Sequence, residues 1–144
     1  MNITIERVRP DEAGAVLRLL EENKLPLDGL REHFDTTIVA RRNEEVVGVA
    51  ALEVYADGAL MRSVAVAPAL QGQGLGRTLT DAVLRLARDL HAPHAYLLTT
   101  TAERYFPKFG FERIERADVP ESVQASIEFR SACPSSATVM RKAL

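Results

Sequence analysis

The feature that most constrains the fold lies between residues 59 and 98, where a strand pattern, a glycine-rich turn, a helical pattern and a second strand pattern follow one another. Residues 59–66 favour a strand, which Pro68 ends. After the turn, apolar residues recur at helical spacing as far as Pro93: Leu75, Leu79, Ala82, Val83, Leu86 and Leu90. Residues 95–98 form a short apolar run typical of a buried strand. A strand, a crossover helix and a strand in this order predict two adjacent parallel strands.

The residues before this segment predict antiparallel strands. Ile3 and Ile5 alternate with polar neighbours, as in a short first strand. Two more strands are expected over residues 38–41 and 46–55, and the hairpin-type turn Asp57-Gly58 leads into the strand 59–66. Between the first two strands we expect a helix from Pro10 to Pro26 and a short second one with these apolar positions: Leu27, Leu30 and Phe34.

The C-terminal part predicts a short helix over residues 102–109, with Gly110 as its C-cap, and two last strands over 111–115 and 138–141. At 144 residues the chain has the size of one domain. We therefore expect a single α/β domain over residues 1–144. Its mixed central sheet has antiparallel N-terminal strands and a parallel pair after the glycine turn, and helices flank it.

Composition excludes several classes of function. The formal net charge of −2 does not suit a nucleic-acid-binding protein, which would show a strong basic excess. No apolar stretch reaches the roughly 20 residues that span a bilayer, and no signal-peptide pattern is present. The lone Cys133 precludes an intramolecular disulfide and favours a reducing cytoplasm. The spacing of the three histidines does not suit a metal site, so no metal is expected.

The glycine turn is typical of a phosphate site. Glycines let the backbone approach a ligand closely, and the first amides of the following helix have no partners within the helix. Gly76 is followed by arginine and threonine, so the lysine of a P-loop is missing. Gly72, Gly74 and Gly76 alternate, which is not the spacing of a dinucleotide fingerprint. The alternative is a connection that only packs a helix on a strand.

The turn resembles the Gln/Arg-x-x-Gly-x-Gly/Ala signature of the GCN5-related N-acetyltransferase superfamily, through Gln71, Gly74 and Gly76. The resemblance implies acetyl-CoA as co-substrate. It places the CoA pyrophosphate on the backbone of the whole turn: Gln71, Gly72, Gln73, Gly74, Leu75, Gly76 and Arg77. It places the pantetheine arm along Val64, Ala65 and Val66. Residues 105–111 resemble the family's later helix, which ends in Gly-Phe, and imply that Phe106 also lies at the cofactor site.

Four further segments resemble the arsenic-resistance type N-acetyltransferases and the acetyltransferase domain of N-acetylglutamate synthase: residues 25–28, 60–66, 96–102 and 128–134. This resemblance implies a small acceptor, either an amino acid or an amino-acid-like toxin of the arsenic or phosphinothricin type. The alternatives are acetylation of a protein N-terminus or lysine, and a non-catalytic CoA-binding module. A homodimer is expected because closed twofold dimers are common.

Acetyl transfer requires a base for the amine, a donor for the oxyanion and a proton for the leaving thiolate. Glu53, in a strand with apolar neighbours on both sides, is the expected base, and the alternative is a solvent-facing carboxylate. The resemblance assigns the oxyanion to a strand amide next to the thioester, here that of Val64 or a neighbour. It also places Phe106 where the family often has an acidic tyrosine. Adjacent helix residues point about 100° apart, so Tyr105 cannot simply substitute for that tyrosine. Tyr105 is the candidate acid, and the alternatives are simple packing of Tyr105 and a thiolate that collects its proton from water. Arg62 and the tail residue Arg130 are the candidates for gripping an acceptor carboxylate.

Overall fold

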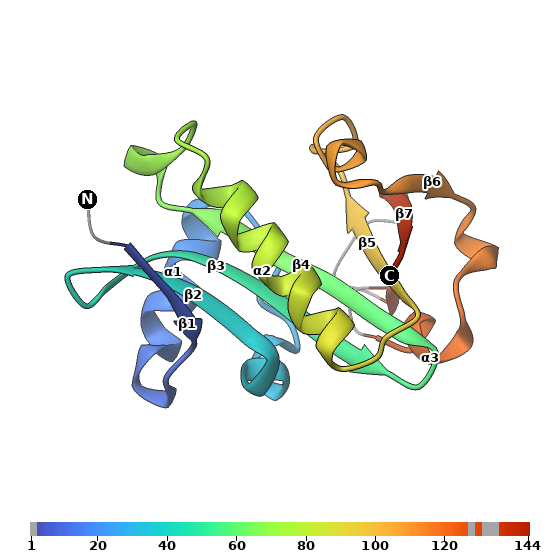
Figure 1. Ribbon diagram of the computed structural model, residues 1–144, viewed down its shortest axis with the longest axis horizontal. Helices are drawn as coiled ribbons and strands as arrows, with labels where there is room; N and C mark the ends of the chain where they lie inside the picture. Colours follow the sequence, from blue (N-terminus) through green and yellow to red (C-terminus); the bar gives the residue numbers. More distant parts are fainter. Residues whose placement is uncertain (1–2, 127–128, 131–135) are drawn as a thin grey trace.

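Seven strands form one mixed sheet in the part of the chain that the computed structural model describes, residues 3–126, 129–130 and 136–144 (Figure 1). The order across the sheet is β1-β2-β3-β4-β5-β7-β6. The strands are β1 (Ile3–Arg7), β2 (Thr37–Arg42), β3 (Glu45–Tyr55), β4 (Gly58–Val66), β5 (His94–Thr99), β6 (Glu112–Ile114) and β7 (Thr138–Ala143).

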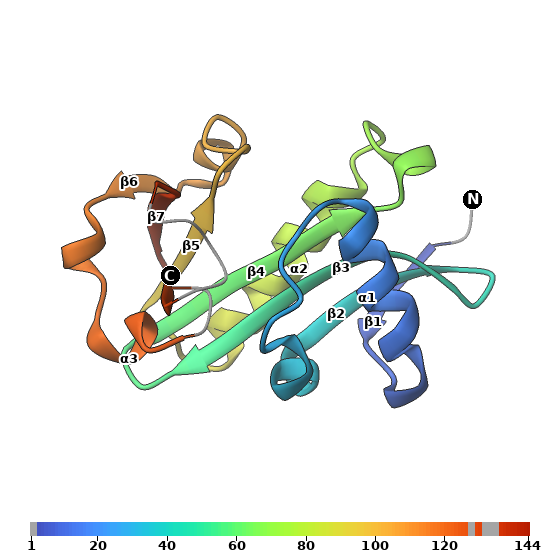
Figure 2. The same cartoon turned by 180° about the vertical axis from the view of Figure 1, so that it is seen from behind.

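Helices cover both faces of the sheet. The long α2 (Leu75–Asp89) lies across the face seen in Figure 1, and α1 (Ala13–Glu22) covers the opposite face in Figure 2, with the short α3 (Glu121–Gln124) at its far end. The described residues also contain short 3₁₀ segments, of which η2 is kinked at His33: η1 (Pro10–Glu12), η2 (Leu30–Thr36), η3 (Pro68–Leu70), η4 (Phe106–Phe109) and η5 (Arg116–Asp118).

The two cores follow from the alternation of side chains along the central strands. Ala50 and Leu52 of β3 pack under α2, whose buried stripe repeats at helical spacing: Leu75, Leu79, Val83 and Ala87. Val49 and Ala51 pack on the other face against the buried side chains of α1. At Gly48 an ideal Cβ would lie only 2.7 Å from Leu79 Cδ1, so this glycine lets α2 approach the sheet closely.

The predicted meander and parallel pair are confirmed. Strands β1 to β4 pair antiparallel in sequence order, and β4 pairs parallel with β5. Beyond β5 the pairing is antiparallel again. Strand β7 lies between β5 and β6 and pairs antiparallel with both. The order of these last strands was not predicted, since each is short and neither carries a turn signal that specifies its neighbour.

The helix predicted over residues 102–109 is wrong in type and length. The structure has only the 3₁₀ turn η4, from Phe106 to Phe109. Pro107 explains the difference, because proline has no amide hydrogen and its ring clashes with the carbonyl four residues earlier inside an α-helix. The predicted C-cap is confirmed, since Gly110 adopts a left-handed φ of 94°.

Strands β4 and β5 diverge soon after they pair (Figure 1). Their register covers only Ala59 with Ala95 and Leu60 with Tyr96. Further along β4, the register with β3 shifts between Val49 and Ala51, and Ser63 adopts a left-handed φ of 59°. A bulge of this kind bends a strand and re-aims the residues that follow it. The diverging end of β4 therefore has a free side toward β5.

No helix among the described residues is both long enough and apolar enough to cross a membrane.

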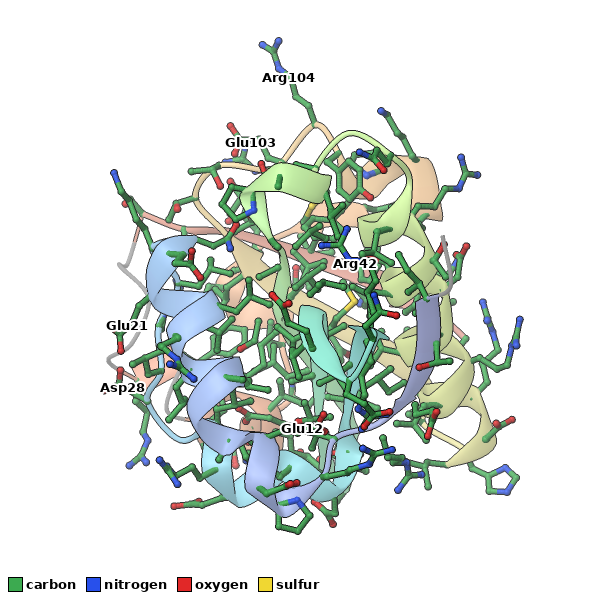
Figure 3. The ribbon with its side chains drawn as sticks, turned by 90° about the vertical axis from the view of Figure 1, so that its left-hand side faces the viewer. Glu12, Glu21, Asp28, Arg42, Glu103 and Arg104 are labelled. Carbon is green, nitrogen blue, oxygen red and sulfur yellow. The ribbon has the colours of Figure 1, made fainter. Side chains whose placement is uncertain are left out.

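A buried ion pair ties the start of α1 to β2. Arg41 is 3% exposed and donates from Nε and Nη2 to the two carboxylate oxygens of Glu12, at 2.6 and 2.7 Å. Glu12 also accepts from the Arg9 amide at 2.7 Å. Figure 3 shows Glu12 beside the start of α1. The hydrogen bonds from Arg41 hold the pKa of the Glu12 carboxyl below its ordinary value of 4.5, although its burial acts in the opposite direction.

Because the folded-state pKa of Glu12 is depressed, the stability it contributes is present above pH 4.5 and is lost as pH falls through the folded-state value. The substitution Glu12→Gln leaves the buried Arg41 with only the exposed Glu6 carboxylate, whose Oε2 lies 3.4 Å from Arg41 Nη1, so we expect a loss of about 3 kcal/mol at pH 7. Urea unfolding at pH 7 and pH 3 measures both effects. The gap between wild type and variant should shrink at pH 3, and an equal gap at both pH values contradicts the assignment.

Candidate active-site cleft

The free side of β4 opens into a cleft of about 610 Å³. Its walls are the end of β4, the glycine turn with the start of α2, and the segment around η4. The described residues that line it are Asn23, Val64, Ala65, Val66, Leu70, Gln71, Gly72, Gly74, Gly76, Arg77, Ala102, Tyr105, Lys108 and Phe109. The predicted turn and the predicted strand residues thus meet in one cavity.

Two glycines of the turn are required by backbone conformation. Gly72 and Gly74 have φ values of 82° and 87°, in the left-handed region that side chains disfavour. An ideal Cβ on either would meet no described atom within 4 Å, so space is not the constraint. Gly76 has an ordinary backbone, and its Cβ would lie 3.6 Å from the Tyr105 hydroxyl oxygen and 3.7 Å from Val66 Cγ2, which are normal contacts.

This difference predicts opposite effects of alanine on stability. Gly76→Ala should stabilise the protein by about 0.5 kcal/mol, because alanine favours a helix over glycine and its methyl group fits. Gly74→Ala should destabilise it by about 1 kcal/mol, because its left-handed φ is strained for a residue with a Cβ. Urea unfolding of the two variants beside wild type tests the pair, and a Gly76→Ala protein less stable than Gly74→Ala overturns the geometry.

The start of α2 presents unpaired amides to the cleft. The first intrahelical hydrogen bond runs from the Thr78 amide to the Gly74 carbonyl, at 3.1 Å. The amides of Leu75, Gly76 and Arg77 therefore precede the first bond and have no acceptor within the helix. No side chain of the described residues caps this end, and no acidic residue lies in the first turn of α2. The positive end of the helix dipole is thus available to an anion.

The end of β4 presents backbone groups to the same cleft. The Ala67 amide donates to the Val47 carbonyl at 2.8 Å, and Val49 pairs with Ala65. Since hydrogen-bonded residues alternate along an antiparallel strand, Ala65 also faces β3, and the peptide groups of Val64 and Val66 face the cleft. The Val66 carbonyl already accepts from the side chains of Gln71 and Asn23, at 3.0 and 3.4 Å.

Tyr105, Phe109 and Lys108 form the opposite wall of the cleft, while Phe106 is 8% exposed and packs in the core against Phe111. The hydroxyl of Tyr105 lies beside the start of α2, near Gly76. Burial raises the pKa of the Tyr105 phenol, and Arg77 partly opposes this shift. The phenol is therefore protonated at neutral pH. The predicted roles of Tyr105 and Phe106 stay predictions, and the geometry exposes Tyr105 rather than Phe106 to a ligand.

Two residues of the predicted pyrophosphate turn face elsewhere. The side chain of Leu75, the first residue of α2, is buried, and Gln73 lines a smaller cavity of about 240 Å³ beside Ile3 and Ile5 of β1. The side chains of Leu75 and Gln73 thus point away from the cleft. The predicted contacts of these two residues with the CoA pyrophosphate are backbone contacts, so they stay a prediction. Figure 3 shows Arg104 projecting into solvent from the segment that precedes Tyr105.

Glu53 is not a solvent-facing carboxylate, since it is 1% exposed. Its Oε2 accepts from Arg62 Nη1 at 2.9 Å, and its Oε1 accepts from the Tyr55 hydroxyl. His33 Nε2 lies 3.5 Å from the same Oε1. Tyr55 and Glu53 are two residues apart on one strand and so share a face of the sheet. This spacing indicates a contact between the two side chains, and the sequence analysis did not include Tyr55. Glu53 is thus the centre of a buried polar cluster.

Arg62 is 3% exposed and holds the segment between α1 and η2. It donates from Nη1 to the Asp28 carbonyl at 2.7 Å and from Nη2 to the Pro26 carbonyl at 3.1 Å, in addition to Glu53. Its Nε donates to Ser63 Oγ at 3.0 Å, next to the bulge. Arg130, by contrast, is exposed. An acceptor carboxylate would have to displace existing partners to reach Arg62.

Cys133, together with most of the tail segment 128–134, lies outside the described residues. Within the described ranges, no group of three histidine, cysteine, aspartate or glutamate residues could hold a metal ion.

A family model identifies the family to which this chain belongs. A family model described as an acetyltransferase (GNAT) domain matches residues 33–113, which include the turn and Tyr105. The amino-acid acetyltransferase of Mycobacterium tuberculosis is 36% identical over 112 residues, which cover 77% of this chain. This chain covers 63% of that relative's length, less than two thirds.

Solved structures show the same fold. One from M. tuberculosis, in complex with CoA and NLQ, has a TM-score of 0.81 and 26% identity, and the match covers 98% of this chain and 99% of that one. N-acetylglutamate synthase from Neisseria gonorrhoeae, complexed with coenzyme A and N-acetyl-glutamate, has a TM-score of 0.85 and 20% identity. That match covers 100% of this chain and 35% of the synthase, and at this identity it shows the fold alone.

Proposed function

We propose that this chain, which belongs to the GNAT acetyltransferase family, transfers an acetyl group from acetyl-CoA to the amino group of a small acceptor. One observation carries the proposal. The uncapped start of α2 and the Val64 peptide group at the end of β4 face the same cleft. An anionic end and a polar, extended arm of one ligand fit these two features together, and CoA has both.

In the proposed complex, the pyrophosphate lies on the backbone of residues 71–77, and Arg77 adds a positive charge at the mouth. The pantetheine arm extends along residues 64–66, where the peptide groups of Val64 face the cleft. Holding both substrates side by side supplies much of the rate, because a bimolecular reaction becomes effectively unimolecular.

The reaction proceeds by attack of the neutral amine on the thioester carbonyl carbon. The Val64 amide donates to the oxyanion that forms, which stabilises the transition state more than the ground state. The carbon–sulfur bond then breaks and the thiolate leaves. A thiol with a pKa near 8.5 is an adequate leaving group, so water can return its proton. Tyr105 is the proposed donor among the side chains, because it lines the cleft and its phenol is protonated at neutral pH.

Glu53 is the proposed base, and it acts through water. Its burial removes it from bulk solvent, and His33, whose side chain is 23% exposed, lies 3.5 Å away and offers a route for the proton to leave. The ion pair with Arg62 fixes the orientation of the carboxylate.

The proposed acceptor is an amino acid or an amino-acid-like toxin of the arsenic or phosphinothricin type. The similarity to an amino-acid acetyltransferase supports the amino-acid class. Arg130, which is exposed, is better placed than the internally paired Arg62 to bind an acceptor carboxylate.

A panel of acceptors tests the proposal, with products identified by mass spectrometry. The panel holds free amino acids, arsenical and phosphinothricin-like analogues, polyamines and peptides. We expect N-acetylated products from carboxylate-bearing small amines, with a KM that rises about tenfold in Arg130→Ala. Products from peptides alone support a protein acetyltransferase instead, and tight CoA binding without any product supports a binding module.

A further inference from the structure

The side-chain amides of Gln71 and Asn23 meet at the end of β4. Gln71 belongs to the glycine turn, whereas Asn23 lies outside the motifs that the sequence analysis identified. Asn23 ends α1, and Gln71 opens the glycine turn. Gln71 Nε2 donates to the Val66 carbonyl at 3.0 Å and to Asn23 Oδ1 at 3.1 Å. Asn23 Nδ2 donates to the Leu19 carbonyl at 2.9 Å and to the Val66 carbonyl at 3.4 Å. We call these two side chains the amide clamp.

The orientation of both amides follows from their partners. The Leu19 and Val66 carbonyls can only accept, so the nitrogen of each amide must face them. Asn23 Oδ1 is then the atom left to face Gln71, and it accepts. Both hydrogens of each amide nitrogen are used. The amide clamp is therefore a satisfied network with one arrangement, which ties α1, β4 and the glycine turn together.

The position of the amide clamp matters because it lies between the two ends of the cleft. On one side is the uncapped start of α2, and on the other is the Val64 peptide group. The clamp occupies the Val66 carbonyl, which faces the cleft, so a ligand arm can pair with Val64 but cannot use this acceptor. It also fixes the distance between the turn and the strand.

We infer that Asn23 and Gln71 are positioning residues that determine the position of the acetyl-CoA thioester along β4. This inference rests on the proposed function. The arm between pyrophosphate and thioester has a set length, so a turn held at one distance from β4 delivers the carbonyl to the Val64 amide. A displaced turn still binds the pyrophosphate, but the carbonyl misses its donor. Errors of about 1 Å in such placement can cost about a hundredfold in rate.

The amide clamp requires a long side chain with N–H donors at residue 71, because Gln71 donates both to the Val66 carbonyl and to Asn23 Oδ1. Arginine also carries several N–H donors at the end of a long side chain, so it can make both bonds. Methionine has similar length and no donor, so it is the informative replacement.

The test compares Asn23→Leu, Gln71→Met, the double variant and Gln71→Arg. Each of the first two should lower kcat about tenfold while KM for acetyl-CoA changes less than threefold. The double variant should be no worse than about twentyfold, because both changes break one network. Gln71→Arg should recover most of the loss seen in Gln71→Met. Values of kcat within twofold of wild type in both single variants, or losses that multiply in the double variant, overturn the inference.

A second readout needs no turnover, so failure of the proposed function can be told apart from failure of the amide clamp. Acetyl-CoA binding should protect the Val64 amide against hydrogen exchange, and this protection should fall about tenfold in Gln71→Met. Gln124→Met is the matched control, because Gln124 Nε2 also donates to two carbonyls, those of Arg116 and Val119, away from the cleft. It should leave the protection of Val64 unchanged. Equal protection in wild type and Gln71→Met overturns the inference, whereas a wild type that protects Val64 but transfers no acetyl group counts only against the proposed function.

Discussion

Replacing Gly74 with aspartate should weaken CoA binding about a hundredfold more than replacing it with asparagine. Both side chains tolerate the left-handed φ of 87° better than other residues do, and they have nearly the same shape. Only aspartate adds a negative charge at the start of α2, against the proposed pyrophosphate. A hundredfold difference corresponds to about 2.7 kcal/mol, which is reasonable for like charges near a protein surface. Isothermal calorimetry with CoA measures both affinities.

Salt provides the control for this pair of variants. The difference between aspartate and asparagine should shrink at high ionic strength, because mobile ions screen an exposed repulsion. Thermal unfolding without CoA should show similar stability for the two proteins. Equal affinities at low salt, in two folded proteins, refute the placement of the pyrophosphate on the turn.

Glu53→Gln should lower kcat about a hundredfold or more, because it removes the proposed base while keeping the shape of the side chain. The substitution also removes the carboxylate that pairs with the buried Arg62 at 2.9 Å, at a cost of about 3 kcal/mol in stability. The loss of activity must therefore be measured well below the unfolding temperature of the variant, with circular dichroism to show that it is folded.

Glu12→Gln is the matched control for Glu53→Gln, since it breaks the other buried arginine–glutamate pair. The two variants should lose similar stability, but only Glu53→Gln should lose catalysis. If Glu53→Gln keeps at least a third of wild-type kcat, the carboxylate is structural and the base lies elsewhere. If both variants lose activity equally, instability rather than chemistry is responsible.

The parts of the fold that the sequence predicted are those with strong local signals. The buried stripe of α2 repeats without interruption, and the turn at Gly58 follows a strand closely, so helix, hairpin and crossover were all found. The helix predicted over residues 102–109 did not take account of Pro107, which disfavours the interior of an α-helix. The place of β7 between β5 and β6 depends on tertiary pairing, which no local pattern records.

The residues of the candidate site also fall into two groups, those that a local sequence pattern predicts and those whose role depends on tertiary contacts. The glycine turn and β4 are continuous in sequence, so their meeting in one cleft was predictable. Asn23 was missed because its role depends on the Val66 carbonyl, 43 residues away. The bulge at Ser63 was also missed, since serine does not commonly adopt a positive φ and gives no sign of it in sequence. Burial of Glu53 was open at the level of sequence, because its cluster is assembled from η2, β3 and β4.

Release of free thiol from acetyl-CoA, measured with and without amino-acid acceptors, tests the central claim most directly. The account predicts slow release without an acceptor and a large, saturable increase with at least one small carboxylate-bearing amine. The N-acetylated product should form in equal amount to the thiol. Release that no acceptor in the panel increases, from a folded protein that binds CoA, would contradict the claim that this chain is an acetyltransferase of small amines.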